Sequence, residues 1–245
     1  MNLRSTLVHR PAKAMLRSVL RRLGHTIIPC SRDASDSWMG LSARPIRTVL
    51  DIGACRGGFA RSILLPRFPE AVVHSFEPSP TAFAALRTVA DASQGRILAH
   101  NVGLGESAGR LSFNSAIDSL PSSSLLPSTA LNGARFPRTA RTETLEVEIS
   151  VLDEIAPMLA IRDDLLVKID VQGYEDRVIR GGRKTISRAV ACIVEVQVAE
   201  LYGGQPSFRD IFILMDELGF RFEGVLEQHS APDGGTLYLD AVFLR

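Results

Sequence analysis

Cysteine is scarce in this sequence of 245 residues: there are three, and no two of them form a C-x-x-C pair. Such a set cannot supply the disulfide framework of a small secreted domain or the thiolate pairs of a zinc site. No apolar run approaches the ~20 residues that cross a bilayer, and early arginines interrupt any signal-peptide core. The low cysteine content and the missing membrane span together predict a cytoplasmic protein.

Several signatures of nucleotide and metal chemistry are also missing. No glycine is followed by lysine, which excludes a Walker loop, and no tyrosine has a lysine four positions later, as short-chain dehydrogenases require. The sequence has no D-x-D, which argues against a metal-dependent glycosyltransferase, and no H-x-x-x-H or cluster of histidine and cysteine. We therefore expect no metal site.

The formal net charge is only +1, but the charge is unevenly distributed. Residues 1–32 carry seven basic residues and no acidic one, which leaves 21 basic against 27 acidic residues in the remainder. A nucleic-acid-binding domain would carry its basic excess on a folded face. A basic lead-in on an acidic body therefore predicts no nucleic-acid partner.

Residues 8–23 have the pattern of a basic amphipathic helix, since Leu16, Val19, Leu20 and Leu23 recur at helical spacing. We expect residues 1–45 to form this helix and a linker. The favoured interpretation is a helix packed on the body with its arginines in water. The alternative is a helix that lies on an anionic membrane surface, which would make the protein peripheral to the inner membrane face.

Residues 46–245 alternate short β-rich runs with helical patterns, which is typical of an α/β domain. Helices are expected to begin at the N-caps Ser79, Ser150 and Ser207, the last two with an aspartate three residues later. The expected parallel strands are 48–52, 71–76, 96–102, 165–169 and 191–196. The last two runs, 220–225 and 238–244, flank an Asp-Gly-Gly turn and predict an antiparallel hairpin that ends the sheet.

Between the third and fourth of these strands lies a different stretch. Residues 110–114 and 144–149 alternate like edge strands, with a turn expected at 105–109, and residues 115–142 are rich in serine and proline. A loop this long inside a compact domain is usually functional or mobile. We interpret it as a lid in which Ser122, Ser123 and Ser124 could bind a polyhydroxylated substrate, with a simple spacer as the alternative.

Polar residues stand where the strands end. Asp51 leads into a glycine turn at 53–58, Glu77 ends the second strand, Asn101 lies near the end of the third, and Asp170 ends the fourth. Open α/β sheets bind ligands beyond the carboxyl ends of their strands, and an acid in the position of Glu77 can hold two ribose hydroxyls. The sequence therefore predicts a nucleoside cofactor.

Glycine spacing and charge indicate which nucleoside. The turn at 53–58 has G-x-x-x-G rather than the G-x-G-x-x-G of dinucleotide sites, and Asp51 would repel a pyrophosphate. S-adenosylmethionine has no phosphate and carries a sulfonium and an ammonium, which Asp51 can complement. Asn101 is assigned to the adenine, with a turn-forming role as its alternative.

Four blocks of this sequence resemble the FkbM family of S-adenosylmethionine-dependent methyltransferases: Val49-Leu50-Asp51-Ile52-Gly53-Ala54-x-x-Gly57-x-Phe59, Phe76-Glu77-Pro78, Asn101-Val102-Gly103-Leu104-Gly105 and Lys168-Ile169-Asp170-Val171-Gln172-Gly173-Tyr174-Glu175. The resemblance covers roughly residues 45–245. It implies a Rossmann-like class I methyltransferase fold with a mainly parallel seven-stranded sheet, and O-methylation of a hydroxyl, often on a sugar or polyketide. One departure is Cys55, where the family usually has asparagine.

The candidate cofactor-binding residues are Asp51, Gly53, Ala54, Cys55, Gly57, Phe59, Glu77, Pro78, Asn101 and Val102. The candidate catalytic residues are Asp170, as general base or acceptor orienter, and Glu195, as an acceptor contact. Asp170 has two alternative roles, a cap on the following helix or a contact to the methionine amine. Glu195 could instead belong to a buried structural pair.

The acceptor is expected to be a small-molecule or glycan hydroxyl, because the fourth-strand motif lacks the [DN]-P-P-[YFW] that many amino-group methyltransferases carry. Two other functions stay open at this point. One is an NAD(P)-dependent oxidoreductase, which the glycine spacing opposes. The other is a non-catalytic module docked at a membrane or a partner through residues 8–23.

Overall fold

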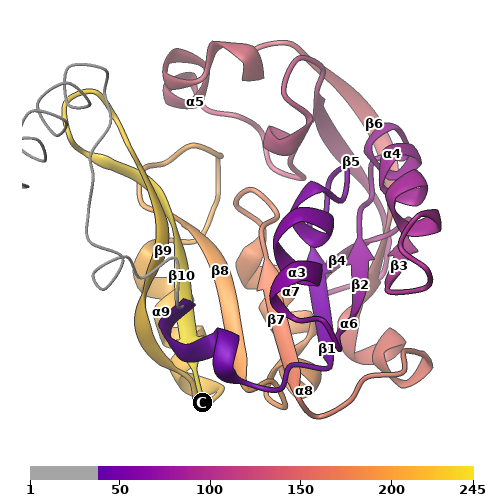
Figure 1. Cartoon of the computed structure of the whole chain (residues 1–245). Helices are drawn as coiled ribbons and strands as arrows, with labels where there is room; N and C mark the ends of the chain where they lie inside the picture. Colours follow the sequence, from indigo (N-terminus) through magenta and orange to yellow (C-terminus); the bar gives the residue numbers. More distant parts are fainter. Residues whose placement is uncertain (1–37) are drawn as a thin grey trace, which may run out of the picture. The chain divides into compact units, whose positions relative to one another are not determined.

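The computed structural model describes residues 38–245 (Figure 1), and the amphipathic helix predicted at 8–23 lies outside the described residues. The described part begins with a 3₁₀ segment, Trp38–Ala43, whose Trp38 and Leu41 are buried in the hydrophobic core. Packing of the domain thus starts earlier than the boundary at residue 46 that the sequence predicts.

A seven-stranded sheet forms the centre of the domain, in the order β3-β2-β1-β7-β8-β10-β9. All neighbouring pairs are parallel except those of β10, which runs antiparallel to β8 and β9. The predicted mainly parallel seven-stranded sheet with a C-terminal antiparallel hairpin is confirmed. The strands are β1 (Thr48–Ile52), β2 (Val72–Phe76), β3 (Ile97–His100), β7 (Leu165–Ile169), β8 (Ala191–Gln197), β9 (Arg221–Ser230) and β10 (Thr236–Leu244).

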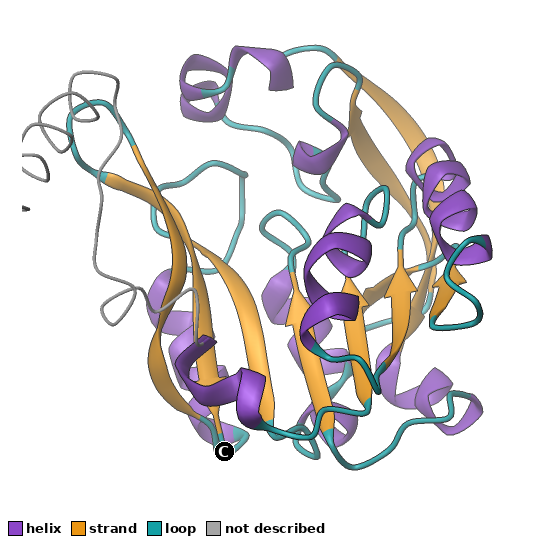
Figure 2. Ribbon diagram, viewed as in Figure 1, coloured by secondary structure: helices purple, strands orange, loops and turns teal. Residues whose placement is uncertain are grey.

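Helices cover both faces of this sheet (Figure 2). One face packs against α6 (Leu152–Ile155), α7 (Glu175–Gly181), α8 (Arg183–Ile186) and α9 (Phe208–Glu217). The other packs against Trp38–Ala43, a π-helical turn (Ala60–Leu64) that continues as α3 (Leu65–Arg67), and α4 (Pro80–Asp91). β1, β7 and β8 are buried along their whole length because they are covered on both sides.

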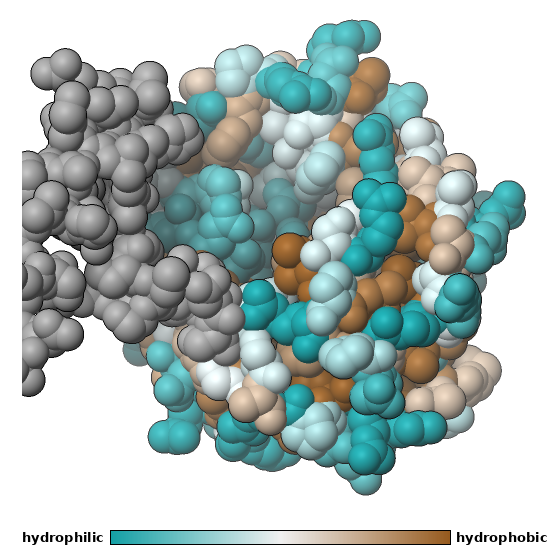
Figure 3. All heavy atoms as spheres, viewed as in Figure 1, coloured by the Kyte–Doolittle hydropathy of each residue, from teal (hydrophilic) through white to brown (hydrophobic). Residues whose placement is uncertain are grey.

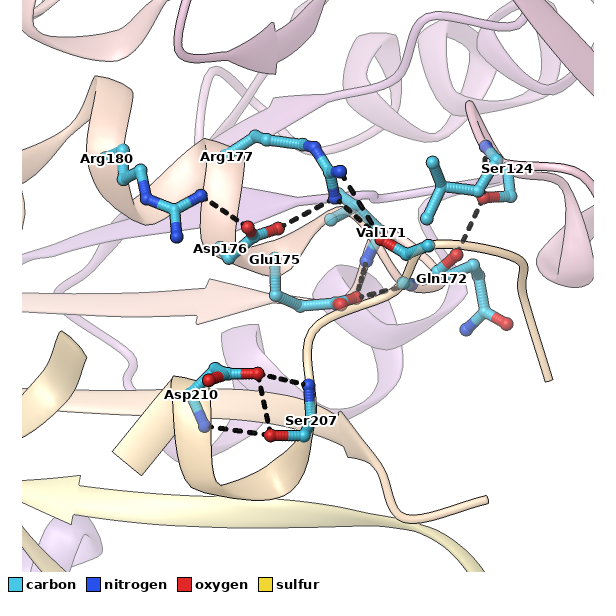
Figure 4. Close-up of polar contacts among 12 residues, drawn as sticks. Ser124, Val171, Gln172, Glu175, Asp176, Arg177, Arg180, Ser207 and Asp210 are labelled. Atoms are coloured by element: carbon cyan, nitrogen blue, oxygen red, sulfur yellow. Dashed lines mark hydrogen bonds and ion pairs between the residues drawn. The ribbon is translucent and has the colours of Figure 1, made fainter. Parts of the chain in front are cut away.

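Two of the three predicted helix caps are confirmed. Ser79 accepts a hydrogen bond from the Ala82 amide at the start of α4, and Ser207 forms a capping box with Asp210 at the start of α9 (Figure 4). The capping box predicted at Ser150 is wrong, because β6 continues through Val151 and keeps Ser150 in a strand. Its aspartate, Asp153, instead accepts the backbone amides of residues 184 and 185 at the start of α8.

The strands predicted at 110–114 and 144–149 are confirmed, but the sequence pattern does not reveal that they belong to a second, three-stranded sheet. It has the order β4-β6-β5, with β4 (Gly103–Gly105), β5 (Gly109–Ala116) and β6 (Thr142–Val151). The turn predicted at 105–109 is therefore partly strand. A Cβ on Gly103 would lie 2.6 Å from Ile149 Cδ1, so any larger residue there would displace the end of the Ile149 side chain.

The segment 115–142 is more ordered than the predicted loop. It contains α5 (Ala130–Arg135) and two 3₁₀ turns, Leu120–Ser122 and Pro137–Thr139. Ser124 joins it to β5 through an isolated bridge with Asn114. Among the described residues, no helix combines the length and the apolar character that crossing a bilayer requires.

Candidate active site

A pocket lies at the carboxyl ends of β1, β2 and β7, where the sequence predicts the cofactor. The space between its walls, open solvent included, is about 530 Å³. The strand ends contribute Gly53, Glu77 and Asp170. Its opposite wall comes from the 115–142 segment, through Leu120, Pro121, Ser123 and Leu125. Mainly hydrophilic residues line a hollow between α5 and the ends of β7 and β8 (Figure 3).

The turn after β1 has a backbone that few residues can adopt. Gly53, Cys55 and Gly57 all have positive φ, at 85°, 49° and 75°. A Cβ on Gly57 would lie 2.8 Å from Leu86 Cδ1, so the turn packs directly on α4. Asparagine tolerates the left-handed conformation better than most residues do, which gives a physical reason for the family's asparagine at position 55.

Cys55 lines the pocket, but its chemistry is that of a packing residue. Burial and the nearby Glu77 carboxylate raise the pKa of the Cys55 thiol to about 11. The thiol is therefore protonated at neutral pH and is a poor nucleophile.

Glu77 is held rigidly across the mouth of the turn. Its Oε2 accepts the Cys55 amide at 2.9 Å, and its Oε1 accepts the Ser79 amide at 2.8 Å. Each carboxylate oxygen keeps a second lone pair, so both can still accept a hydroxyl hydrogen. Burial raises the pKa of Glu77 to about 7. This cradle suits the two hydroxyls of a ribose.

Asp51 lies beneath the turn and is fully buried, and it is not among the residues that line the pocket. Its Oδ2 accepts the Ser75 hydroxyl at 3.4 Å, whereas its Oδ1 has no hydrogen-bond partner. Lys168 Nζ stands 3.9 Å from that Oδ1. Burial raises the pKa of Asp51. Asp51 Oδ1 therefore has an ion pair but no hydrogen bond, and a buried carboxylate below the pocket fits a cationic cofactor.

The remaining predicted cofactor residues divide into two groups. Pro78 and Val102 line the pocket and form an apolar slot with Phe76 and Leu104. Ala54, Gly57, Phe59 and Asn101 do not line it. The exposed Asn101 side chain instead donates to the carbonyl oxygens of Glu77 and Pro78, at 2.9 and 3.2 Å, which is the turn-forming role weighed above.

The structure brings the two candidate catalytic residues together through Gln172. Asp170 lines the pocket, and its Oδ1 accepts Gln172 Nε2 at 2.8 Å. Glu195 is buried, and its Oε1 accepts the same nitrogen at 2.6 Å. Burial, together with the nearby carboxylates of Asp170 and Asp240, raises the pKa of Glu195. Asp170 can thus meet a ligand directly, whereas Glu195 lies behind it.

Lys168 is a residue whose importance the sequence reasoning misses. It is buried, donates to Asp170 Oδ2 at 3.0 Å, and lies 4.9 Å from the centre of the Phe59 ring. Burial alone would lower the pKa of Lys168, but the carboxylates of Asp170 and Asp51 outweigh it and raise the pKa. The sequence does contain a sign of this role, because Lys168 is the single charged residue in the otherwise apolar strand β7. Within residues 38–245, no group of three or more potential metal ligands is gathered.

The sequence of this chain is similar to a family of methyltransferases and to two of its named members. The family model described as Methyltransferase FkbM domain matches residues 51–222. The chain is 29% identical over 206 residues to the 2-O-methyltransferase NoeI of Sinorhizobium fredii, covering 81% of this chain and 82% of that protein. It is 31% identical over 204 residues to the 31-O-demethyl-FK506 methyltransferase FkbM of Streptomyces tacrolimicus, covering 74% and 75%.

The crystal structure of methyltransferase FkbM from Methylobacillus flagellatus KT matches with a TM-score of 0.48 and 15% sequence identity. The match covers 81% of this chain and 43% of that one.

Proposed function

The chain belongs to the FkbM family of S-adenosylmethionine-dependent methyltransferases, and we propose that it methylates a hydroxyl of a sugar, glycoconjugate or polyketide-type metabolite. The first relative is named a 2-O-methyltransferase, and the second is named a methyltransferase of 31-O-demethyl-FK506. The observation that supports this function best is the Glu77 carboxylate, fixed by two backbone amides at the edge of the pocket.

The pocket residues have distinct roles toward the cofactor. Glu77 would hold the ribose hydroxyls, and the turn at Gly53 and Cys55 would hold the methionine end. Pro78 and Val102 would enclose the adenine. When bound, S-adenosylmethionine supplies an electrophilic methyl group on a positively charged sulfur. The buried carboxylate of Asp51 complements that charge from below.

Asp170 is the proposed acceptor of the hydroxyl proton. It lines the pocket, and its two oxygens are oriented by Lys168 and Gln172. The cofactor held in the pocket would supply the methyl group, and Asp170 would orient the acceptor hydroxyl toward it. The hydroxyl proton passes to the Asp170 carboxylate. A methyl transfer of this kind requires that the acceptor be aligned with the methyl group and that a base be in place, and it requires no metal.

The 115–142 segment is proposed to exclude water from this reaction. Leu120, Pro121 and Leu125 place apolar surface opposite the strand ends. Ser124 Oγ donates to the Gln172 carbonyl oxygen at 2.7 Å, which ties the segment to the end of β7 (Figure 4). A lid anchored in this way can cover the cofactor without leaving the strand ends.

Calorimetric titration of S-adenosylhomocysteine tests the cofactor assignment. We expect Glu77→Ala to weaken binding roughly 10- to 100-fold, the scale of lost hydrogen bonds to a charged group. The matched control is Glu70→Ala, an exposed glutamate just before β2, which should bind like the wild type. Equal affinity in wild type and Glu77→Ala would remove the ribose role, and no binding by the wild type would overturn the function.

A further inference from the structure

The side chain of Gln172 joins two carboxylates that face each other across neighbouring strand ends. Its Nε2 donates to Asp170 Oδ1 at 2.8 Å and to Glu195 Oε1 at 2.6 Å. A primary amide has two N–H groups, so each carboxylate receives one of them. The one side chain therefore separates two negative charges that would otherwise repel.

The orientation of this amide is fixed from its other end. The Tyr202 hydroxyl donates to Gln172 Oε1 at 2.6 Å, and the Tyr202 ring is buried. Burial and the Glu195 carboxylate raise the pKa of Tyr202, so the phenol keeps its proton. A flipped amide would turn its oxygen toward the two carboxylates, which have no hydrogen to donate when ionised, so the ionised pair favours the observed orientation.

The backbone of Gln172 is held in a costly conformation. Its φ is 56°, in the left-handed region that residues with a Cβ rarely adopt. Glu175 Oε1 accepts the backbone amides of Val171 and Gly173 on either side, both at 3.1 Å, and Ser124 Oγ donates to its carbonyl oxygen (Figure 4). Backbone strain that the surroundings maintain is a feature of functional sites.

We propose that Gln172 is a positioning residue, which holds Asp170 against Glu195 so that a free Asp170 lone pair faces the acceptor hydroxyl. This inference rests on the proposed methyl transfer at Asp170. Gln172 itself takes no proton. Its amide compensates the charge of Glu195, so that Asp170 does not turn away from the pocket when both carboxylates are ionised.

Other charged groups face the pair and act on it as well. Asp51 and Lys168 approach from β1 and β7, Asp240 from β10, and Glu175 from α7. The phenols of Tyr202 and Tyr238 are also close to Glu195. Lys168 donates to Asp170 but not to Glu195, which leaves the amides of Gln172 and Gln197 as the donors to Glu195 Oε1. Removal of the Gln172 amide should therefore affect Glu195 more than Asp170, which keeps Lys168 as a donor.

The test is a pH titration of carboxyl carbons by NMR, with ¹³C-labelled aspartate and glutamate and the Glu195 signal assigned through Glu195→Gln. In Gln172→Met we expect the Glu195 midpoint to rise by about one to two pH units, the equivalent of one lost hydrogen bond to a charged group. Tyr202→Phe, which frees the amide to turn, should shift it in the same direction by a smaller amount. Gln228→Met, the same change at an exposed glutamine on β9, should leave it unmoved.

An unmoved Glu195 midpoint in both Gln172→Met and Tyr202→Phe would overturn the proposal, and Tyr202→Phe alone decides if Gln172→Met does not fold. With an identified acceptor, Gln172→Met should also lower kcat at least about tenfold and shift the pH profile. The Glu195 midpoint reports the amide bridge itself, whereas kcat and its pH profile report the effect of that bridge on Asp170, which a merely structural residue would not change. The NMR titration needs no turnover, so it fails separately from the proposed function, which fails if the wild type does not bind S-adenosylhomocysteine.

Discussion

A Cβ added to Gly53 would stand 1.8 Å from the carbonyl oxygen of Asp170, so the first turn and the end of β7 touch backbone to backbone. Gly53 also has a φ of 85°. We expect Gly53→Ala to destabilise the fold by about 2–4 kcal/mol through overpacking and strain. Because the same contact shapes the pocket, binding of S-adenosylhomocysteine should be lost. Urea unfolding and calorimetry would measure the two effects.

Gly58→Ala is the matched control for that change. Gly58 lies in the same turn, and a Cβ there would meet no atom within 4 Å. We expect its unfolding free energy to stay within about 0.5 kcal/mol of the wild type, as for ordinary surface substitutions. Equal stability and binding for Gly53→Ala and Gly58→Ala would contradict the close contact of the two loops.

The pH dependence of cofactor binding should follow Glu77, whose pKa burial raises to about 7. Ribose hydroxyls donate to the ionised carboxylate, so binding favours that form and is linked to proton release. Affinity for S-adenosylhomocysteine should therefore be full above pH 7 and weaken as the pH falls below it, by up to about tenfold per pH unit. Calorimetry at pH 5.5, 6.5, 7.5 and 8.5 measures this slope. Glu77→Gln should bind more weakly and lose the slope, and an equally steep slope in that variant would assign the titration to another group.

The position of Glu77 illustrates what could be predicted from the sequence. An apolar β-run that stops at an acid places that acid at the carboxyl edge of a parallel sheet, whatever the exact packing of the domain. The same reasoning placed Asp170 correctly at the pocket. Alternation and turn residues likewise predicted β1 with its observed ends and the antiparallel C-terminal hairpin.

Contacts between distant segments could not be predicted in this way. Asp153 follows a serine at capping-box spacing, but its carboxylate caps α8, about one β-α unit further along the chain. One of the two amides that Glu77 accepts belongs to another loop, and Gln172 reaches Glu195 only because β7 and β8 pair in parallel. Local sequence patterns carry no information on such pairs, because the pairs are brought together by the register of neighbouring strands and by the packing of distant segments.

Removal of Lys168 should leave buried carboxylates without compensation. Lys168→Met is expected to destabilise the fold by about 3–5 kcal/mol, because Asp51 and Asp170 lose their shared cation. Burial already raises the pKa of Asp51, so its neutral form is the one that the folded state favours once the lysine is gone. Stability from such a group is present at low pH and is lost as the pH rises through its folded pKa. The deficit of Lys168→Met should therefore be smaller at pH 5 than at pH 8 in urea unfolding.

The double variant Asp51→Asn/Lys168→Met separates charge from packing. If the cost of Lys168→Met is mainly electrostatic, replacing Asp51 as well should recover much of the lost stability. No recovery, together with a pH-independent deficit, would assign the cost to the packing of the lysine stem on Phe59.

Asp170 and Glu195 should differ in their effect on turnover, because only Asp170 lines the pocket. With an acceptor identified from a panel of sugars and polyketide alcohols, Asp170→Asn is expected to lower kcat by about 10²–10⁴, the usual contribution of a positioned base. Glu195→Gln should lower it less, since that side chain lies behind Gln172 and acts on Asp170 through it. Asp163→Asn, at an exposed aspartate, serves as the control. Radiolabelled methyl transfer at saturating cofactor measures all three. A larger loss in Glu195→Gln than in Asp170→Asn would reverse the two roles and make Glu195 the group that meets the acceptor.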